Sequence, residues 1–169
     1  ARGLEIATVD LPGLPRSVEV TPDGAVSFVA TDAGLSIIDV SVPGSPVLNS
    51  IPVSGGVNDL DVSPDGQSIH AVSRVNEKLY RFHFDASVVP PGEPVTLLNE
   101  ISLTEVPRGI LIDPSGKRAF VSTVGEIQVW DINAASATFE NQVGSLTGPG
   151  PVLLGPLAID PAGGHLFAT

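Results

Sequence analysis

A proline-glycine turn recurs four times along this chain of 169 residues, and no other feature limits the possible folds so strongly. The prolines of successive copies are separated by 42, 50 and 47 residues. That interval is the length of one four-stranded sheet of a β-propeller, and it is too long for a leucine-rich or hexapeptide solenoid. The four copies are Thr21–Gly24, Ser63–Gly66, Asp113–Gly116 and Asp160–Gly163.

Each turn has a physical reason to form. Proline presets φ at the first corner, Asp or Ser can hydrogen-bond to the following backbone, and glycine takes the positive φ that turns the next strand back. Gly and Pro together make 34 residues (18 plus 16), as many short strands joined by many turns require. The 42% hydrophobic content argues against disorder, and no segment has a convincing helical period. The sequence therefore predicts an all-β chain.

The residues around the turns also align from copy to copy. Apolar residues four positions before each proline predict one face of an inner strand: Val18, Leu60, Ile110 and Leu157. An aromatic residue four positions after the glycine suits a ring packed between adjacent sheets, and His70 departs from this pattern: Phe28, His70, Phe120 and Phe167. Third strands are expected at Leu35–Val40, Leu79–Phe84 and Ile127–Ile132, and outer strands at Val47–Val53, Thr96–Leu103 and Gln142–Leu146.

These alignments predict a β-propeller of four-stranded antiparallel blades, of which about three and a half are present. Residues 1–14 are expected to hold an outer strand (Leu4–Leu11) of a preceding or closing blade, residues 15–56, 57–106 and 107–153 to form blades, and residues 154–169 to form the first half of a further blade. A four-bladed ring closed by the N-terminal strand is one possibility. We expect instead a fragment of a larger ring of about six to eight blades.

At the repeated segments the chain resembles the YVTN-type bacterial β-propeller repeats. The matching segments are VEVTPDGAVSFVAT, LDVSPDGQSIHAVS, ILIDPSGKRAFVST and LAIDPAGGHLFAT. The segment AGLSIIDVSVPGSPVLNSIPV also resembles the related LVIVD repeat of bacterial surface proteins. The resemblance implies a secreted or cell-surface location, although this chain contains no signal peptide. It is specific for fold and weak for function, because propellers host many unrelated activities.

The charge of the chain limits its partners. Eight basic and 19 acidic residues give a net charge of −11, and no basic cluster is present to bind a phosphate backbone. Nucleic acid is therefore not expected as a partner. No apolar run is long enough to span a bilayer. The chain has no cysteine, which excludes disulfides, thiolate metal sites and cysteine nucleophiles.

The best candidates for ligand binding lie where the inner strands begin, at the mouth of the expected central channel. Arg16, Asn58, Asp59 and Arg108 are predicted to form a polar funnel there. The alternative is that these side chains hydrogen-bond neighbouring loops and cap strand ends. The proline-rich insertion Asp85–Pro94 is expected at the rim, where it contacts a partner or acts as a spacer.

No catalytic residue, metal ligand or cofactor site is predicted. The three histidines lack metal-ligand spacing, and no Gly-x-Ser-x-Gly elbow or phosphate-binding glycine loop is present. The turn aspartates could suggest calcium, but a calcium site needs six to eight converging oxygens, and turn formation explains these residues without a metal.

We therefore expect a non-enzymatic exported or cell-surface module that serves as a rigid interaction or structural scaffold. Its expected partners are proteins, glycans or matrix, and the remaining blades of a parent chain or another copy. The alternative is a propeller enzyme of lactonase type with an active site at the channel mouth.

Overall fold

The computed structural model describes residues 8–42, 44, 46–88, 92–147 and 155–168, and these residues form strands and turns without any helix. The strands are β1 (Pro15–Val20), β2 (Val26–Thr31), β3 (Gly34–Asp39), β4 (Val47–Pro52), β5 (Asp59–Val62), β6 (Ser68–Ser73), β7 (Lys78–Phe84), β8 (Val95–Ser102), β9 (Gly109–Ile112), β10 (Arg118–Ser122), β11 (Glu126–Asp131), β12 (Gln142–Thr147), β13 (Leu157–Ile159) and β14 (Leu166–Ala168). No helix in this part of the chain is long and apolar enough to cross a membrane. Half of the expected outer strand Leu4–Leu11 lies outside the described residues, and residues 8–14 form no strand.

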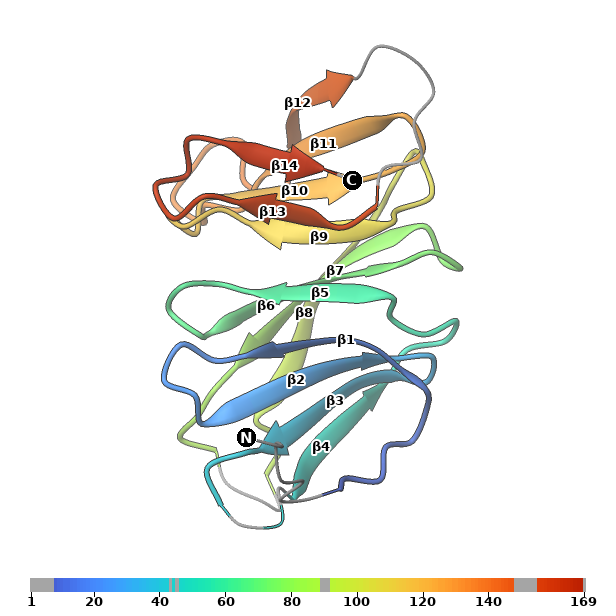
Figure 1. The fold of residues 1–169 in the computed structure, drawn as a ribbon, viewed down its shortest axis with the longest axis vertical. Coiled ribbons are helices and arrows are strands. Elements are labelled where there is room, and N and C mark those ends of the chain that lie inside the picture. Colours follow the sequence, from blue (N-terminus) through green and yellow to red (C-terminus); the bar gives the residue numbers. More distant parts are fainter. Residues whose placement is uncertain (1–7, 43, 45, 89–91, 148–154, 169) are drawn as a thin grey trace, which may run out of the picture.

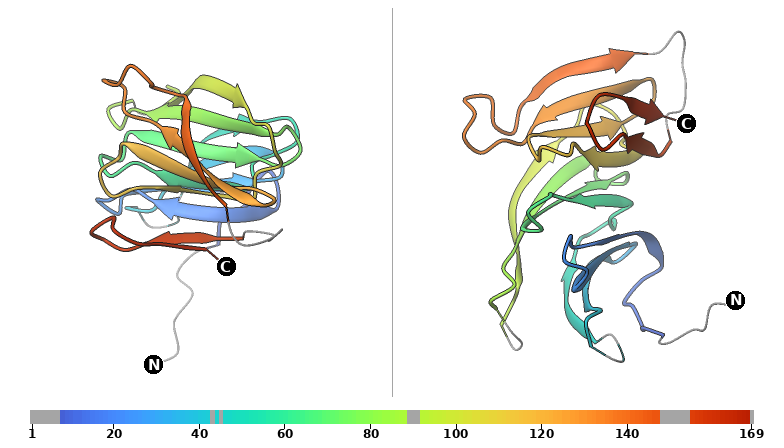
Figure 2. Two further views of the ribbon diagram at one scale, coloured as in Figure 1. Left: turned by 90° about the horizontal axis from the view of Figure 1, so that it is seen from above. Right: turned by 60° about the vertical axis from the view of Figure 1, so that its left-hand side comes forward.

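The strands form four antiparallel sheets in chain order, which confirms the predicted all-β class and four-stranded units. The first sheet holds β1–β4, the second β5–β8, the third β9–β12, and the two-stranded sheet holds β13 and β14. The inner strands β1, β5, β9 and β13 lie side by side in succession, and the sheets fan out from them (Figures 1 and 2). Among the described residues, the first sheet and the two-stranded sheet lie at opposite ends of this stack (Figure 1).

A bulge recurs at the same place in each four-stranded sheet. The register between the third and fourth strands shifts at Ile37/Ile38, at Arg81/Phe82 and at Val129/Trp130. One extra residue on the outer strand increases the local right-handed twist. The repetition extends to irregular features of the backbone, so these sheets are true structural repeats and share more than a strand count.

The proline-glycine turns stack on one another at one end of the inner strands. A Cβ added at Gly66 would lie 3.3 Å from Cδ of Pro22, and one added at Gly116 would lie 3.1 Å from Cδ of Pro64. Both glycines also have a positive φ, which side chains rarely adopt. Glycine is therefore required at these positions by the backbone conformation and by the neighbouring proline together.

The residues four positions after each glycine occupy matching places in successive sheets. Each one pairs, across the first two strands, with the residue three positions before the proline: Phe28 with Glu19, His70 with Asp61, Phe120 with Leu111 and Phe167 with Ala158. Phe28 is fully buried between the first and second sheets, with its ring 5.2 Å from that of Phe84 in an edge-to-face contact. The predicted packing of this position between sheets therefore holds at the first interface.

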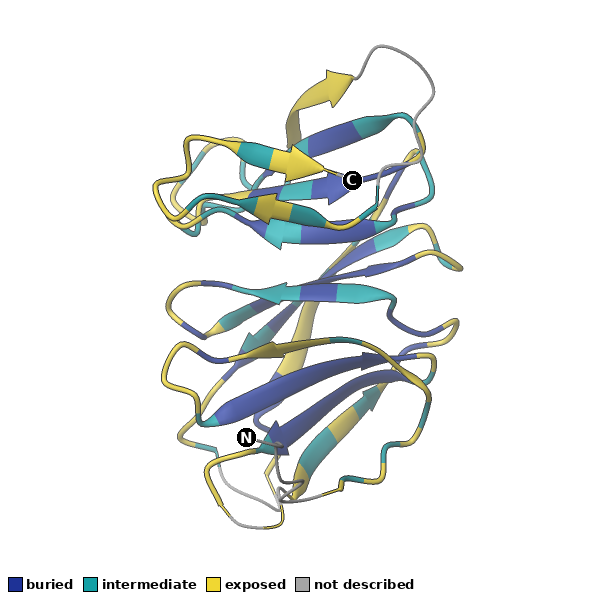
Figure 3. Cartoon of the chain, in the orientation of Figure 1, coloured by how far each residue is buried: buried dark blue, intermediate teal, exposed yellow. Residues whose placement is uncertain are grey.

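Between the second and third sheets lies an apolar core that is distinct from the core around Phe28. It contains Val72, Leu79, Leu103, Ile110, Ala119, Val121 and Trp130. Figure 3 shows that β2 and β3 of the first sheet are buried, whereas the inner strand β1 and the strand β14 are mostly exposed. The core of this protein thus lies in the interfaces between sheets.

Candidate functional site

The four residues predicted at the channel mouth lie at the start of successive inner strands, each with its own contacts. Arg16 approaches Asp32 at 3.8 Å, and both side chains are about half exposed. Asn58 accepts a hydrogen bond of 2.6 Å from the backbone N–H of Arg74 through its Oδ1. The buried Nε of Arg108 has no hydrogen-bond partner within the described residues. The contacts of Arg16 and Asn58 are of the local kind that strand capping requires, and a ligand-binding role for these residues stays a prediction.

Asp59 and Asp61 connect the second sheet to the third. The Oδ2 of Asp59 accepts a bond of 2.9 Å from the N–H of Ile110, and the Oδ2 of Asp61 accepts one of 2.6 Å from the N–H of Ile112. Residues two apart on one strand share a face, so both carboxylates reach the same edge of β9. Ser17 of the first sheet also hydrogen-bonds Asp59. These carboxylates therefore join three inner strands through side chains.

A third acid on the inner strands interacts electrostatically with this pair. Burial raises the pKa of Asp59 and, together with the charge of Asp59, raises the pKa of Asp61. Partial burial and the charges of Asp61 and Asp59 raise the pKa of Glu19. Within the described residues, no group of three His, Asp or Glu side chains is arranged to hold a metal ion. The arrangement can hold protons and accept hydrogen bonds, and its oxygens already bind backbone amides.

Asp61→Asn is expected to stabilise the protein at pH 7. Because the pKa of Asp61 is raised in the native state, the native protein binds more protons than the unfolded chain between the unfolded pKa near 4 and the native pKa. The contribution of this group to stability is complete below the unfolded pKa and is lost as the pH rises through the native pKa. Asparagine resembles the neutral acid and can still accept the N–H of Ile112.

Urea unfolding at pH 7 and at about pH 4 checks this prediction, because the gain should shrink at the lower pH. Asp23→Asn is the matched control. Hydrogen bonds from the Thr21 hydroxyl and the Ala25 amide lower the pKa of Asp23, so its ionised form stabilises the fold above the unfolded pKa. This variant should lose stability at pH 7. A loss of stability at pH 7 on Asp61→Asn would contradict the account.

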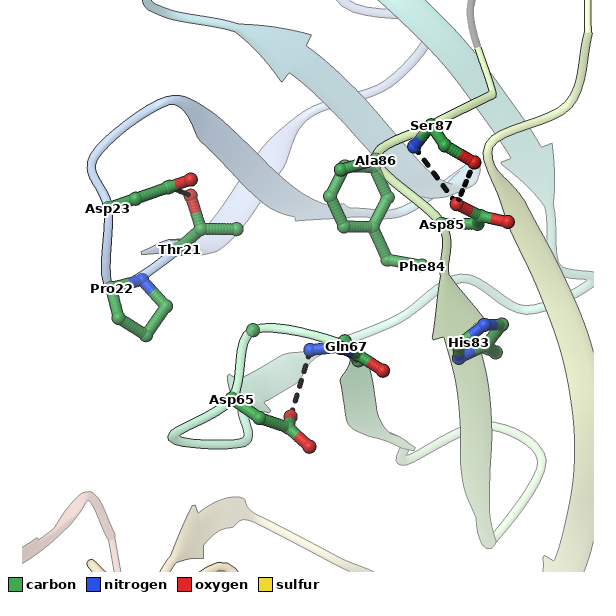
Figure 4. A pocket seen from close by; sticks show the side chains of 11 residues that line it. Thr21, Pro22, Asp23, Asp65, Gln67, His83, Phe84, Asp85, Ala86 and Ser87 are labelled. Carbon is green, nitrogen blue, oxygen red and sulfur yellow. Dashed lines mark hydrogen bonds between the residues drawn. The ribbon is translucent and has the colours of Figure 1, made fainter.

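A pocket lies at the opposite end of the inner strands, between the turns of the first and second sheets. It has a volume of about 470 Å³ and is lined by the turns Thr21–Asp23 and Asp65–Gln67 and by the segment His83–Ser87 (Figure 4). The predicted rim insertion contributes its first residues, Asp85 to Ser87, to this pocket. Sequence reasoning missed this pocket, because the pattern that locates each turn does not say what the turns enclose.

Three aspartates of this pocket are each held by hydrogen bonds within their own turn. The Oδ1 of Asp23 accepts from Thr21 Oγ1 at 2.5 Å, that of Asp65 from Ser63 Oγ at 2.5 Å, and that of Asp85 from Ser87 Oγ at 2.6 Å. These bonds lower the pKa of all three carboxyls. Turn formation thus accounts for the position of each aspartate, and calcium binding remains untested.

Comparison with known proteins identifies the fold. No family model matches the chain, and no curated protein matches its sequence. Hydrazine synthase of Kuenenia stuttgartiensis matches 99% of this chain and 44% of its own chain, with a TM-score of 0.75 and 23% identity. The β-propeller domain of Cps50 (Swd1) from Myceliophteria thermophila matches 92% of this chain and 49% of its own, with a TM-score of 0.73 and 18% identity.

At these identities the similarity establishes the fold alone. This chain spans less than half the length of either structure that it matches. Together with the repeated sheets and their stacked turns, the comparison confirms the predicted fold: the chain is a β-propeller segment with three four-stranded blades and a two-stranded sheet in its described residues.

Proposed function

We propose that this β-propeller segment is a non-enzymatic, rigid interaction and structural module whose two end faces bind further blades. Those blades come from a longer chain or from a second copy. The resemblance to YVTN and LVIVD repeats extends the proposal to an exported or cell-surface module, with its rim loops available for protein, glycan or matrix contacts.

The observation that carries the proposal is a difference in burial between equivalent positions. Val18 of β1 is 58% exposed, whereas the equivalent Leu60 and Ile110 in the next two sheets are 1% and 5% exposed. At the other end of the stack, Phe167 is 59% exposed, whereas the equivalent Phe28 is fully buried. The interior residues are covered by a neighbouring sheet. The apolar character of the end residues is explained if a neighbouring sheet covers them as well.

Sedimentation velocity over a range of protein concentrations, at about 0.15 M salt to screen the negative charge, tests the proposal. The chain is expected to self-associate through its end faces. The double variant Val18→Glu, Phe167→Glu should stay monomeric with an unchanged circular dichroism spectrum, because both side chains are exposed. If the chain without substitutions is monomeric at every concentration and does not bind a hydrophobic dye, the proposal is refuted.

The raised pKa values of Glu19, Asp59 and Asp61 favour the second candidate, a lactonase-type enzyme. Lactone hydrolysis measured with and without calcium separates the two functions. The scaffold function predicts no hydrolysis above the uncatalysed rate. Hydrolysis that is lost on Asp59→Asn would favour the enzyme.

A further inference from the structure

The strand β14 has an open edge in the described part of the chain. Its sheet holds only β13 and β14 there, whereas each of the other three sheets continues into a third and a fourth strand (Figure 1). The C=O of His165 accepts the N–H of Asp160 at 3.0 Å. Because backbone groups alternate in direction along a strand, His165 and Phe167 face β13, and the N–H and C=O groups of Leu166 and Ala168 point to the open edge.

The three complete sheets show which bond a third strand makes at the equivalent edge. The N–H at the end of the third strand donates to the C=O of the residue that follows the turn glycine. These bonds run from Val40 to Ala25 at 2.9 Å, from Phe84 to Gln67 at 2.8 Å and from Ile132 to Lys117 at 2.9 Å. Gly164 holds the acceptor position in the fourth copy. A strand added to β14 can therefore make the same backbone bond.

The face of the third sheet beside this edge is less covered than its counterparts. Leu146 of β12 holds the position of Ile51 in β4 and of Ile101 in β8, because each of them pairs with the first apolar residue of its third strand. Ile51 and Ile101 are partly buried against the cores between sheets, whereas Leu146 is 50% exposed. The other residues of β12 are exposed as well. The third sheet thus presents an apolar position that the first two sheets cover.

Third strands supply apolar side chains at alternate positions to the interfaces between sheets. Tyr80, Phe82 and Phe84 of β7 all belong to the core between the first and second sheets. Trp130 of β11 belongs to the core between the second and third sheets, and Ile132 packs against that core. Residues two apart on a strand share a face. A segment added to β14 in the same way would therefore direct its alternate apolar side chains onto the third sheet.

A second copy of this chain has no third strand free to fill the open edge. The strands β3, β7 and β11 each lie between two neighbours in their own sheets and are paired on both edges. Donating one of them would break a four-stranded sheet. The occupant that fits is therefore a third strand from a further repeat of a longer chain.

We propose that the open edge of β14 and the adjoining face of the third sheet bind the third strand of a further repeat, an extended segment with large apolar side chains at alternate positions. Backbone hydrogen bonds to Gly164, Leu166 and Ala168 hold the segment, and the contacts of its apolar side chains with the third sheet select its sequence. This inference rests on the proposed function, because it specifies what one end of the stack binds.

A terminally blocked, fluorescent peptide with the sequence of Lys78–Phe84 tests the proposal by fluorescence anisotropy with the intact chain. This segment has the required apolar alternation, and its Lys78 and Arg81 suit a chain with a net charge of −11. We expect a dissociation constant of about 10–100 µM.

Hydrogen exchange of the backbone amides, followed by nuclear magnetic resonance, locates the bound peptide. The amides of Leu166 and Ala168 should gain protection on binding, and the amide of Phe167, which faces β13, should change little. Protection confined to the amides of β6 would mean that the peptide displaces β7, and it would contradict the proposal. Protection of Leu166 and Ala168 that rises with chain concentration in the absence of peptide would show that a second copy covers the edge, which also contradicts it.

Backbone methylation of the peptide provides a matched pair of probes. The N–H of Phe82 faces the second strand, as does that of Phe84 two residues later, whereas the N–H of Arg81 faces the outer strand. A methyl group on the backbone nitrogen of Phe82 should therefore weaken binding by at least about tenfold. The same group on Arg81 should change the dissociation constant by less than about threefold.

Leu146→Glu tests the contribution of the third sheet. The variant is expected to fold, because the side chain is half exposed, and to bind the peptide at least about tenfold more weakly. Val75→Glu is the control, since Val75 is 72% exposed in the turn between β6 and β7, away from the proposed site. Its binding should equal that of the chain without substitutions.

Three binding results would overturn the proposal. They are the absence of binding at about 1 mM peptide, equal effects of the two methyl groups, and binding that Leu146→Glu leaves unchanged. Sedimentation of the chain without peptide separates this inference from the proposed function. A chain that self-associates but binds no peptide refutes the inference alone, whereas a monomeric chain that binds no hydrophobic dye refutes the proposed function.

Discussion

Phe28→Ala is expected to lower the free energy of unfolding by about 3–5 kcal/mol. Phe28 is fully buried between the first and second sheets, where its ring contacts Phe84. Removing the ring loses its transfer free energy and leaves a cavity that the surrounding β-sheets cannot collapse to fill. Equilibrium unfolding in urea measures the effect through the transition midpoint.

Phe167→Ala is the matched control, because Phe167 holds the same repeat position in the two-stranded sheet. Its side chain is 59% exposed, so its truncation should change the free energy of unfolding by less than about 0.5–1 kcal/mol. The contrast between these variants tests whether burial between sheets determines the stability of this fold. Equal losses from both would contradict it.

Glu140→Ala is expected to lower the free energy of unfolding by about 2–3 kcal/mol, the second largest effect. The Oε1 of Glu140 accepts from Arg81 Nε at 2.5 Å, and its Oε2 accepts from Asn99 Nδ2 at 2.6 Å. Both sides of the ion pair are mostly buried. Removing the carboxylate therefore deprives a partly desolvated guanidinium and an amide of their partner at once. Urea unfolding again provides the measurement.

Glu100→Ala is the control for this second prediction. Glu100 pairs with Lys78 at 2.7 Å, but its side chain is 51% exposed. Exposed ion pairs contribute about 0–1 kcal/mol, so this variant should lose little stability. A loss as large as that of Glu140→Ala would show that burial does not distinguish the two pairs.

The features that the sequence predicted well are those with a short-range physical cause. The proline-glycine turns depend on backbone preferences of three or four residues, and the alternation of Val18 and Val20 with polar residues depends on the two-residue period of a strand. Because both recur at a regular interval, equivalent positions of the inner and second strands could be aligned between repeats from the sequence.

The features that the sequence did not predict join residues far apart in the chain. Glu140 lies in the loop between β11 and β12 and binds Arg81, 59 positions earlier. No periodicity indicates such a contact. Asp59 and Asp61 are two residues apart, so a strand places them on one face, but their bonds to the amides of β9 depend on how closely neighbouring sheets approach.

The candidate sites also differ in whether local sequence or contacts between distant residues determine them. The start of each inner strand could be located, which is why Arg16, Asn58, Asp59 and Arg108 were predicted as a group. The pocket between the turns of the first and second sheets, and the smaller pocket beside His70, depend on which side chains meet between sheets. The sequence showed that His70 departs from the aromatic pattern, and in the structure His70 lines the smaller pocket between the second and third sheets.

The central claim is that successive repeats stack side by side as blades, and nuclear Overhauser contacts between the turns test it most directly. The account predicts cross-peaks from the Hα protons of Gly66 to the Hδ protons of Pro22, and from Gly116 to Pro64 and Gly163 to Pro114 in the same way. Each contact joins residues more than 40 positions apart, so no local structure can produce it. The absence of all three cross-peaks from a well-resolved spectrum of the folded chain would contradict the account.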